Sequence, residues 1–164
     1  TIGYNNSAFG YDSLKSNTTG TYNTAIGYGT LVSNTTGSFN SAFGHGALLY
    51  NVTGNNNTAF GYFALFYNTA NNNSAFGINS LRNNTTGAYN TALGHTTLRD
   101  NTTGASNVAI GHASMLGASG GSYNTAVGFQ SLFYNAANCF CIGVFSFELY
   151  YQIVEDHFRK DQPN

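Results

Sequence analysis

The sequence has 164 residues, of which only 7% are charged, and its formal net charge is −1 at pH 7. Typical globular domains are about one quarter charged. Nucleic-acid binding requires clustered Lys and Arg to contact phosphates, and the chain has no such cluster. No apolar run reaches the roughly 18 residues of a membrane span. The 41% hydrophobic and 15% aromatic content, spaced periodically, argues against disorder.

A five-residue motif, Asn-[Ser/Thr]-Ala-Φ-Gly, recurs eight times along the chain, where Φ is Phe, Ile, Leu or Val and one copy has Val108 in place of Ser or Thr. Its glycines lie 17 residues apart, except for one step of 16 between Gly61 and Gly77. The full repeat reads N-[ST]-A-Φ-G-x-x-[AST]-L-x-x-N-T-T-G-x-[YF], and its positions are numbered 1 to 17 from the motif Asn. The copies begin at Asn6, Asn23, Asn40, Asn57, Asn73, Asn90, Asn107 and Asn124.

This period is too short for helix-pair repeats and suits one coil of a β-solenoid, built from two short strands joined by tight turns. Asn, Thr and Gly all disfavour helix, and the two glycines of each copy suit turns. We therefore predict an all-β fold, a parallel β-solenoid (β-roll) of about eight 17-residue coils. The solenoid domain is expected over residues 1–147. It begins with part of a coil at Thr1, which indicates a processed chain or a piece of a longer protein.

Side chains alternate across a strand, so the motif has two unlike faces. We expect the bulky face, positions 2 and 4, to fill the lumen together with Leu at position 9. Ala occupies position 3 in every copy, which predicts a close-packing ladder against the opposite lumen wall or a neighbouring chain, and hence an assembly surface. This ladder comprises Ala8, Ala25, Ala42, Ala59, Ala75, Ala92, Ala109 and Ala126.

The Asn residues at positions 1 and 12 have two interpretations. They can form ladders that bond coil to coil, as in stacked cross-β structures. Alternatively, the position-12 residues lie in Asn-x-Thr or Asn-x-Ser sequons and would be glycan acceptors in a secreted eukaryotic chain. The ladder interpretation is favoured. The possible glycosylation sites in this row are Asn17, Asn34, Asn51, Asn84 and Asn101.

Other surface features have structural explanations that compete with ligand binding. His45, His95 and His112 share position 6 with tyrosines, so a ring-stacking row is favoured over a metal site and no metal is assigned. Paired threonines such as Thr35 and Thr36 could form an ice- or sugar-binding array, and surface tyrosines could stack on sugars. We expect no catalytic residues and no cofactor.

A degraded ninth copy follows, in which Cys141-Ile142-Gly143 is aligned with Ala-Φ-Gly. Cys141 would then occupy the Ala position. A disulfide bond between chains is conceivable there, and a buried free thiol is an equal alternative. Residues 148–164 carry most of the charge and show helical spacing, which predicts a C-terminal cap or short helix.

The motif copies Asn23-Thr24-Ala25-Ile26-Gly27 and Asn107-Val108-Ala109-Ile110-Gly111 resemble the head repeats of trimeric autotransporter adhesins. The longer repeat with Asn-Thr-Thr-Gly is also similar to repeats of phage-type tail fibres. The resemblance implies a left-handed roll, three chains side by side, and exposure at a cell or virion surface.

We therefore expect a non-enzymatic, extracellular fibre or filament subunit that is structural or adhesive. Its expected partner is itself, as a homotrimer or an end-to-end filament, with a host-surface or glycan receptor as a further possibility. The alternatives are a receptor-binding tail-fibre segment and an ice- or glycan-binding solenoid.

Overall fold

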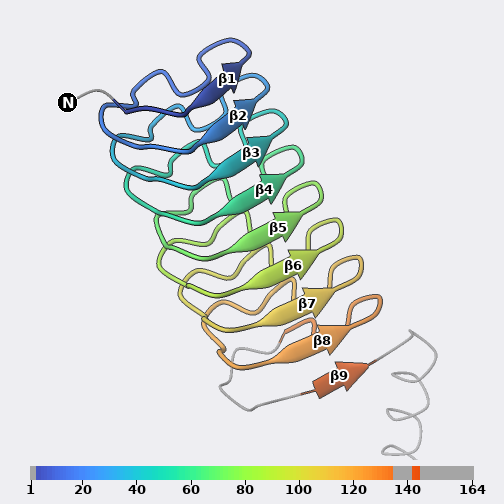
Figure 1. Cartoon of the computed structure of the whole chain (residues 1–164). Coiled ribbons are helices and arrows are strands. Elements are labelled where there is room, and N and C mark those ends of the chain that lie inside the picture. Colours follow the sequence, from blue (N-terminus) through green and yellow to red (C-terminus); the bar gives the residue numbers. More distant parts are fainter. Residues whose placement is uncertain (1–2, 135–141, 145–164) are drawn as a thin grey trace, which may run out of the picture.

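The computed structural model describes residues 3–134 and 142–144 as a parallel β-solenoid with one strand per coil (Figure 1). The nine strands form one sheet in the order β1 to β9. The predicted fold class and the coil length of about 17 residues are confirmed. The strands are β1 Ser7–Phe9, β2 Thr24–Ile26, β3 Ser41–Phe43, β4 Thr58–Phe60, β5 Ser74–Phe76, β6 Thr91–Leu93, β7 Val108–Ile110, β8 Thr125–Val127 and β9 Ile142–Val144.

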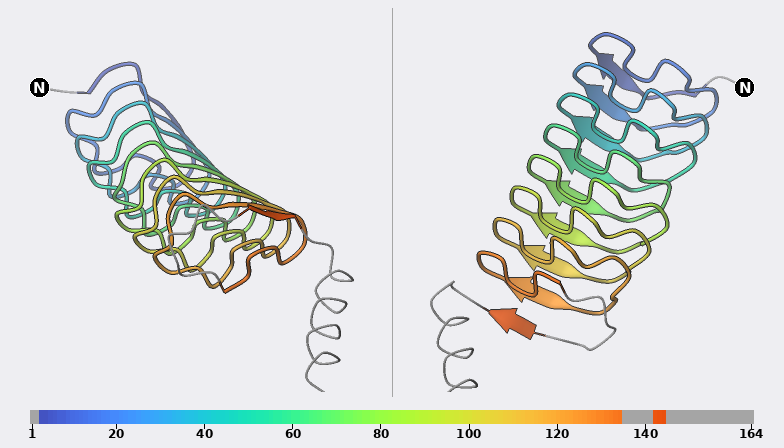
Figure 2. Two further views of the ribbon diagram at one scale, coloured as in Figure 1. Left: turned by 90° about the horizontal axis from the view of Figure 1, so that it is seen from below. Right: turned by 180° about the vertical axis from the view of Figure 1, so that it is seen from behind.

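Neighbouring strands pair in parallel so that identical repeat positions lie side by side. Ala42 of β3, for example, pairs with Ala59 of β4. The repeat that is one residue shorter does not change the strand register, since Ala59 pairs with Ala75 of β5. Figure 2 shows that the turn segments between the strands also stack coil on coil. Each column of side chains along the rod therefore comes from one position of the repeat.

The second strand predicted for each coil does not form in the described residues, 3–134 and 142–144. At position 9 the backbone is left-handed, with φ of 50° at Leu31 and 52° at Leu48. An extended strand requires negative φ, so this segment cannot continue as β-structure. The coils still bond here, because the Leu31 N–H donates to the Ala47 carbonyl over 3.1 Å. The strain of a left-handed leucine is offset by its complete burial and by this bond.

The prediction that positions 2 and 4 fill the lumen is wrong, because these side chains point outward. Ile26 is 40% exposed and Phe60 is 55% exposed, whereas the intervening position 3 is buried. The lumen holds alanine of position 3 and leucine of position 9, together with the buried residues of positions 1, 8 and 12, and these leave the bulky side chains of positions 2 and 4 outside. Of the predicted close-packing ladder, Ala8 in the first coil is exposed. The buried members are Ala25, Ala42, Ala59, Ala75, Ala92, Ala109 and Ala126.

These buried alanines face the lumen, so the close approach that keeps them small comes from the opposite wall of the same chain. The leucines of position 9 form that wall, as predicted. A neighbouring chain does not reach the buried alanines. The interchain contact considered for this ladder is therefore excluded for these seven residues.

Two ladders of buried asparagine join the coils, as predicted. At position 1 the Asn40 N–H donates to Asn23 Oδ1 over 3.0 Å, and Asn40 Nδ2 donates to the Gly54 carbonyl over 2.8 Å. At position 12 Asn51 Nδ2 donates to both Asn34 Oδ1 and the Gly54 carbonyl, at 3.1 and 2.9 Å. Each amide therefore bonds to the Gly54 carbonyl of its own repeat and to the preceding coil, which meets the requirement that buried polar groups be paired.

The motif glycine closes the strand where only glycine fits. Gly61 has φ of 141°, and a Cβ there would lie 2.5 Å from the carbonyl oxygen of Gly77 in the next coil. Backbone therefore stacks directly on backbone at this corner.

The ninth coil continues the 17-residue period, which corrects the predicted alignment. In β9, Ile142 pairs with Thr125 and Gly143 pairs with Ala126. Gly143 rather than Cys141 thus occupies the Ala position, where an added Cβ would lie 2.7 Å from Leu132 Cγ. The error arose because Ile142-Gly143 was matched to Φ-Gly. Cys141 itself and the predicted cap lie outside the described residues.

We predict that Asn51→Asp is more destabilising than Asn51→Ala at neutral pH. Alanine removes two donated bonds and should cost about 1–3 kcal/mol. Aspartate places a buried carboxylate against two acceptors, Asn34 Oδ1 and the Gly54 carbonyl, and should cost about 3–5 kcal/mol. Burial raises the pKa of that carboxyl, so its excess cost should decrease as the pH falls through the raised value. Urea unfolding at several pH values measures both effects, and equal costs at neutral pH would contradict the ladder.

We also predict that Ala118→Asn stabilises the protein. The position-12 ladder stops at Ala118, and Asn101 Oδ1 in the coil before it is buried with no hydrogen-bond partner. An asparagine there would donate to this oxygen and to the Gly121 carbonyl, as in the preceding coils, for a gain of about 1 kcal/mol. Ala118→Leu is the control, since it adds volume without a donor and should not stabilise.

Candidate functional site

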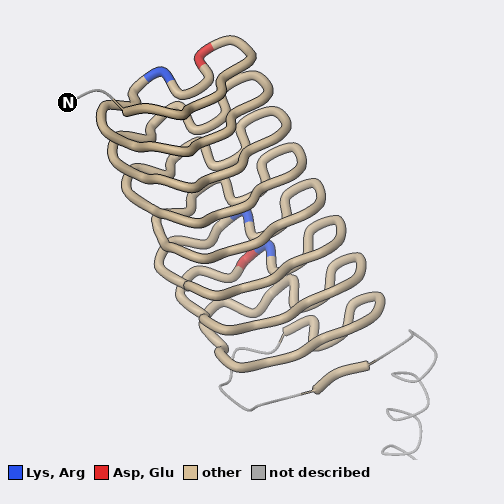
Figure 3. Tube along the Cα trace, viewed as in Figure 1, with Lys and Arg blue, Asp and Glu red and all other residues tan. Residues whose placement is uncertain are grey.

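The outer face of the sheet is the most extended functional candidate, and it is defined here by the side chains at positions 2 and 4. Ser, Thr and Val, with Ile142 in β9, form one row at position 2, and apolar side chains at position 4 form a parallel row along the described rod. None of the strands contains a charged residue (Figure 3). The apolar row consists of Phe9, Ile26, Phe43, Phe60, Phe76, Leu93, Ile110, Val127 and Val144.

These side chains are exposed in the single chain, from 37% at Ile110 and Val127 to 76% at Phe9, except that Phe43 is half-buried. Soluble monomers rarely expose contiguous apolar patches of more than a few hundred Å², and larger ones mark interaction sites. Sequence reasoning missed this face because it assigned the bulky side chains to the core. The signal that could have revealed it is the constant Ala between them, which must point to the side with less room.

A row of rings at position 6 borders this face. Tyr28 stacks on His45 with centroids 5.0 Å apart, and His45 stacks on Tyr62 at 5.2 Å. Further along, the His95 and His112 rings are parallel to within 6° at 5.1 Å. The predicted ring-stacking row is confirmed. Among the described residues, no three His, Cys, Asp or Glu side chains come together as a metal site would require.

The surface tyrosines do not present open ring faces in the way that sugar stacking requires. Tyr50 and Tyr67 lie face to face, with centroids 5.3 Å apart and planes within 5°. One face of each ring is therefore covered by the other. This stacking leaves less of each ring face for a sugar, while the tyrosine hydroxyls are groups suited to hydrogen bonding.

The threonine rows are only partly free. The first hydroxyl of each pair bonds to the next coil, as where Thr35 Oγ1 donates to the Val52 carbonyl over 3.2 Å and Thr85 Oγ1 donates to the Thr102 carbonyl over 2.9 Å. The second threonine, such as Thr36 or Thr86, is exposed beside the turn glycine. A single row beside a turn is a poorer template for ice than two flat rows on a sheet.

The sequon asparagines of position 12 are buried, except that Asn17 in the first coil is half-buried. Asn34, Asn51, Asn84 and Asn101 are completely buried in the ladder. A glycan on any of these four amides cannot be accommodated in the folded chain.

We predict that folded protein secreted from eukaryotic cells lacks glycans on these four residues. Sequons at Asn5 and Asn56 have exposed side chains and provide the comparison. Mass spectrometry of chymotryptic glycopeptides, with fragmentation that assigns each glycan to one residue, should find occupancy only at exposed sequons in the folded fraction. A glycan on Asn51 in folded protein would contradict the buried ladder.

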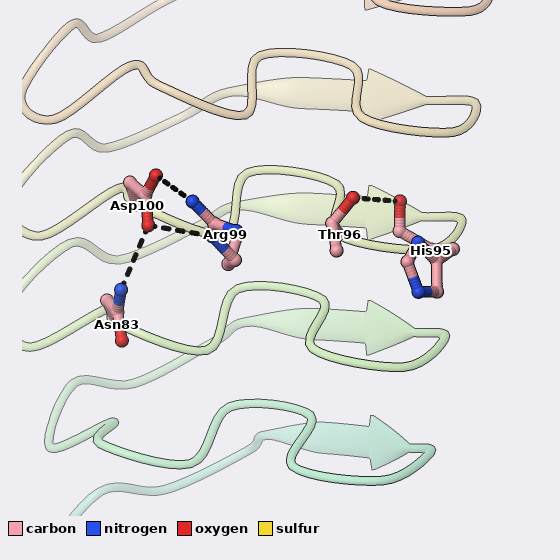
Figure 4. A network of polar contacts seen from close by, with 5 residues as sticks. All are labelled: Asn83, His95, Thr96, Arg99 and Asp100. Carbon is pink, nitrogen blue, oxygen red and sulfur yellow. Dashed lines mark hydrogen bonds and ion pairs between the residues drawn. The ribbon is translucent and has the colours of Figure 1, made fainter.

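Most of the few described charges are paired. Arg99 Nε and one of its terminal nitrogens donate to the two carboxylate oxygens of Asp100 at 2.9 and 2.8 Å, and Asn83 Nδ2 donates to the same carboxylate at 3.0 Å (Figure 4). The hydrogen bond from Arg99 is the main reason that the pKa of Asp100 is lowered. In the same view the Thr96 hydroxyl bonds to the His95 carbonyl over 2.8 Å, so it holds the turn rather than a ligand.

Comparison with known proteins finds no matching family model, no matching curated protein and no matching solved structure. In the part of the chain that the structure describes, no helix is able to cross a membrane. The functional argument therefore depends on the surface itself.

Proposed function

We propose that this chain is a non-enzymatic fibre segment that assembles with further copies of itself through the outer face of its sheet, at a cell or virion surface. The observation that carries this proposal is the exposed apolar row at position 4, which continues over every described strand. Burying such a row removes apolar surface from water, at about 25 cal/mol per Å².

A second copy of the chain is the partner that this face suits best. Its rows repeat with the coil spacing, so the faces of two copies match coil for coil along their length. No charged side chain lies on the strands, so burial carries no cost of desolvating ions, and the face offers nothing to a charged partner. The arrangement is similar to that implied by the resemblance to trimeric autotransporter adhesin heads, in which three chains lie side by side.

An adhesive role at a surface agrees with the chemistry of the rest of the coil. The interior is filled by alanine, leucine and paired asparagine, which leaves the outward positions as the place for contacts with a partner. An isolated rod of this kind would have a thin core, and lateral packing of copies would strengthen it. A tail-fibre segment would assemble in the same manner and differ only in its receptor.

The experiment is a measurement of mass in solution by light scattering, together with electron micrographs of the purified chain. We expect a trimer or a longer assembly of parallel rods. A monomer at high micromolar concentration would overturn the proposal.

Substitutions locate the contact. The double variant Ile26→Glu and Phe60→Glu should dissociate the assembly to monomers, because buried unpaired carboxylates are costly. Val52→Glu is the matched control: Val52 is as exposed as Ile26, at 40%, but lies on a turn outside the sheet. Light scattering measures the mass of each variant and circular dichroism verifies folding. Equal dissociation by both substitutions would show that charge alone, rather than this face, is responsible.

A further inference from the structure

Arg82 lies on a cluster of aromatic rings that interrupts the regular rows of the rod. Its guanidinium carbon is 5.7 Å from the centroids of Phe63 and Phe66 and 5.9 Å from that of Tyr67. Phe66 and Tyr67 meet edge to face at 4.7 Å, and Tyr50 stacks on Tyr67. The cluster lies on the turn segments of three successive coils, outside the strands of the sheet.

Among the described cations, Arg82 is the one without an ion pair. Lys15 pairs with Asp12 at 3.2 Å, and Arg99 pairs with Asp100 at 2.8 Å. The charge of Arg82 contributes to lowering the pKa of Asp100, after the larger effects of Arg99 and Asn83, but those two residues hold the carboxylate. The Nε atom of Arg82 is buried without a hydrogen-bond partner.

This arrangement prepares a guanidinium for an anion. Packing on rings holds the planar group in one orientation, so less freedom is lost when a ligand binds. A carboxylate or sulfate can take two parallel N–H bonds from such a group, and charge-assisted bonds of this kind are about twice as strong as neutral ones. Arg82 as a whole is only half-buried, so part of it remains accessible.

The neighbouring tyrosines indicate what carries the anion. Tyr50 and Tyr67 are 46% and 42% exposed, and they occupy the same repeat position in adjacent coils with their rings stacked. The Arg82 guanidinium carbon lies 5.9 Å from the Tyr67 ring centroid, and a sugar that bears hydroxyls and one acidic group is the ligand class that matches one guanidinium next to two adjacent tyrosines. A single unpaired cation is too little for a polyphosphate such as nucleic acid.

We propose that Arg82, Tyr50 and Tyr67 bind the acidic group and adjacent hydroxyls of an anionic saccharide. The site is separate from the outer face of the sheet and does not depend on self-assembly. The double variant Ile26→Glu and Phe60→Glu should therefore keep this binding even as a monomer.

The test is titration calorimetry of the whole chain with four probes of similar length. These are a galacturonic acid oligosaccharide, a sulfated dextran oligosaccharide, a neutral dextran oligosaccharide and a poly-glutamate peptide. Binding of the first or second identifies carboxylate or sulfate as the acidic group. Saturable binding of neither overturns the proposal, as does equal affinity for the neutral probe. Equal affinity for poly-glutamate would overturn the assignment of a saccharide and indicate an acidic peptide as the ligand.

Arg82→Gln should weaken the binding of the acidic saccharide about tenfold or more, since it removes a charge-assisted pair of bonds. The double variant Arg99→Gln and Asp100→Asn is the matched control, because it lies one coil away, removes both charges of the pair and leaves no extra carboxylate near Arg82; it should leave affinity within about twofold. If the glutamine variant fails to fold, Arg82→Lys is the substitute test, because it keeps the charge and loses the planar guanidinium. It should also bind the acidic saccharide more weakly than the original chain. Similar losses in the Arg99 and Arg82 variants would overturn the assignment.

Discussion

The whole solenoid depends on hydrogen bonds between buried asparagine amides of successive coils. The lumen is filled by side chains, the largest of them leucine and methionine, so most polar groups turned inward find partners within their own turn or in the coil above or below. Asn51 donates to the Gly54 carbonyl of its own turn and to Asn34 of the preceding coil, and Asn40 donates to Asn23 of the preceding coil and to the Gly54 carbonyl. Because each amide bonds along the rod axis, a single coil cannot satisfy its own interior. Only a stack is stable.

The same narrowness determines what the surface exposes. With position 1 turned inward for its ladder, the alternation of the strand turns position 3 inward and positions 2 and 4 outward. The lumen then holds Ala59 and Leu65, and Phe60 lies on the outside. The most hydrophobic position of the motif therefore keeps a substantial part of its apolar area uncovered in one chain. Its apolar area is available for contact with another chain, which connects the ladder directly to the proposed assembly.

The sequence was sufficient for the coil length, the parallel stacking and the asparagine ladders, because these follow from the period and from the pairing needs of buried amides. It did not predict which face of the strand points into the lumen, since alternation defines two faces and does not decide which of them is inside. It also missed the left-handed backbone at Leu31, because propensities assign leucine to ordinary helix or strand. The alignment of Gly143 failed because a local match to Φ-Gly competed with the exact period.

A rod of identical inward columns leaves only its outward positions free to vary. A change at Asn51 or Gly61 disturbs bonds or contacts to the neighbouring coil, so such positions are held constant by the fold itself. Positions 10 and 11 carry no such restriction, and they differ from coil to coil. Phe66, Tyr67 and Arg82 occupy them in two adjacent coils. Whatever distinguishes one segment of this rod from another must therefore be encoded on these turns, and the aromatic cluster around Arg82 is the clearest departure from uniformity in the described chain.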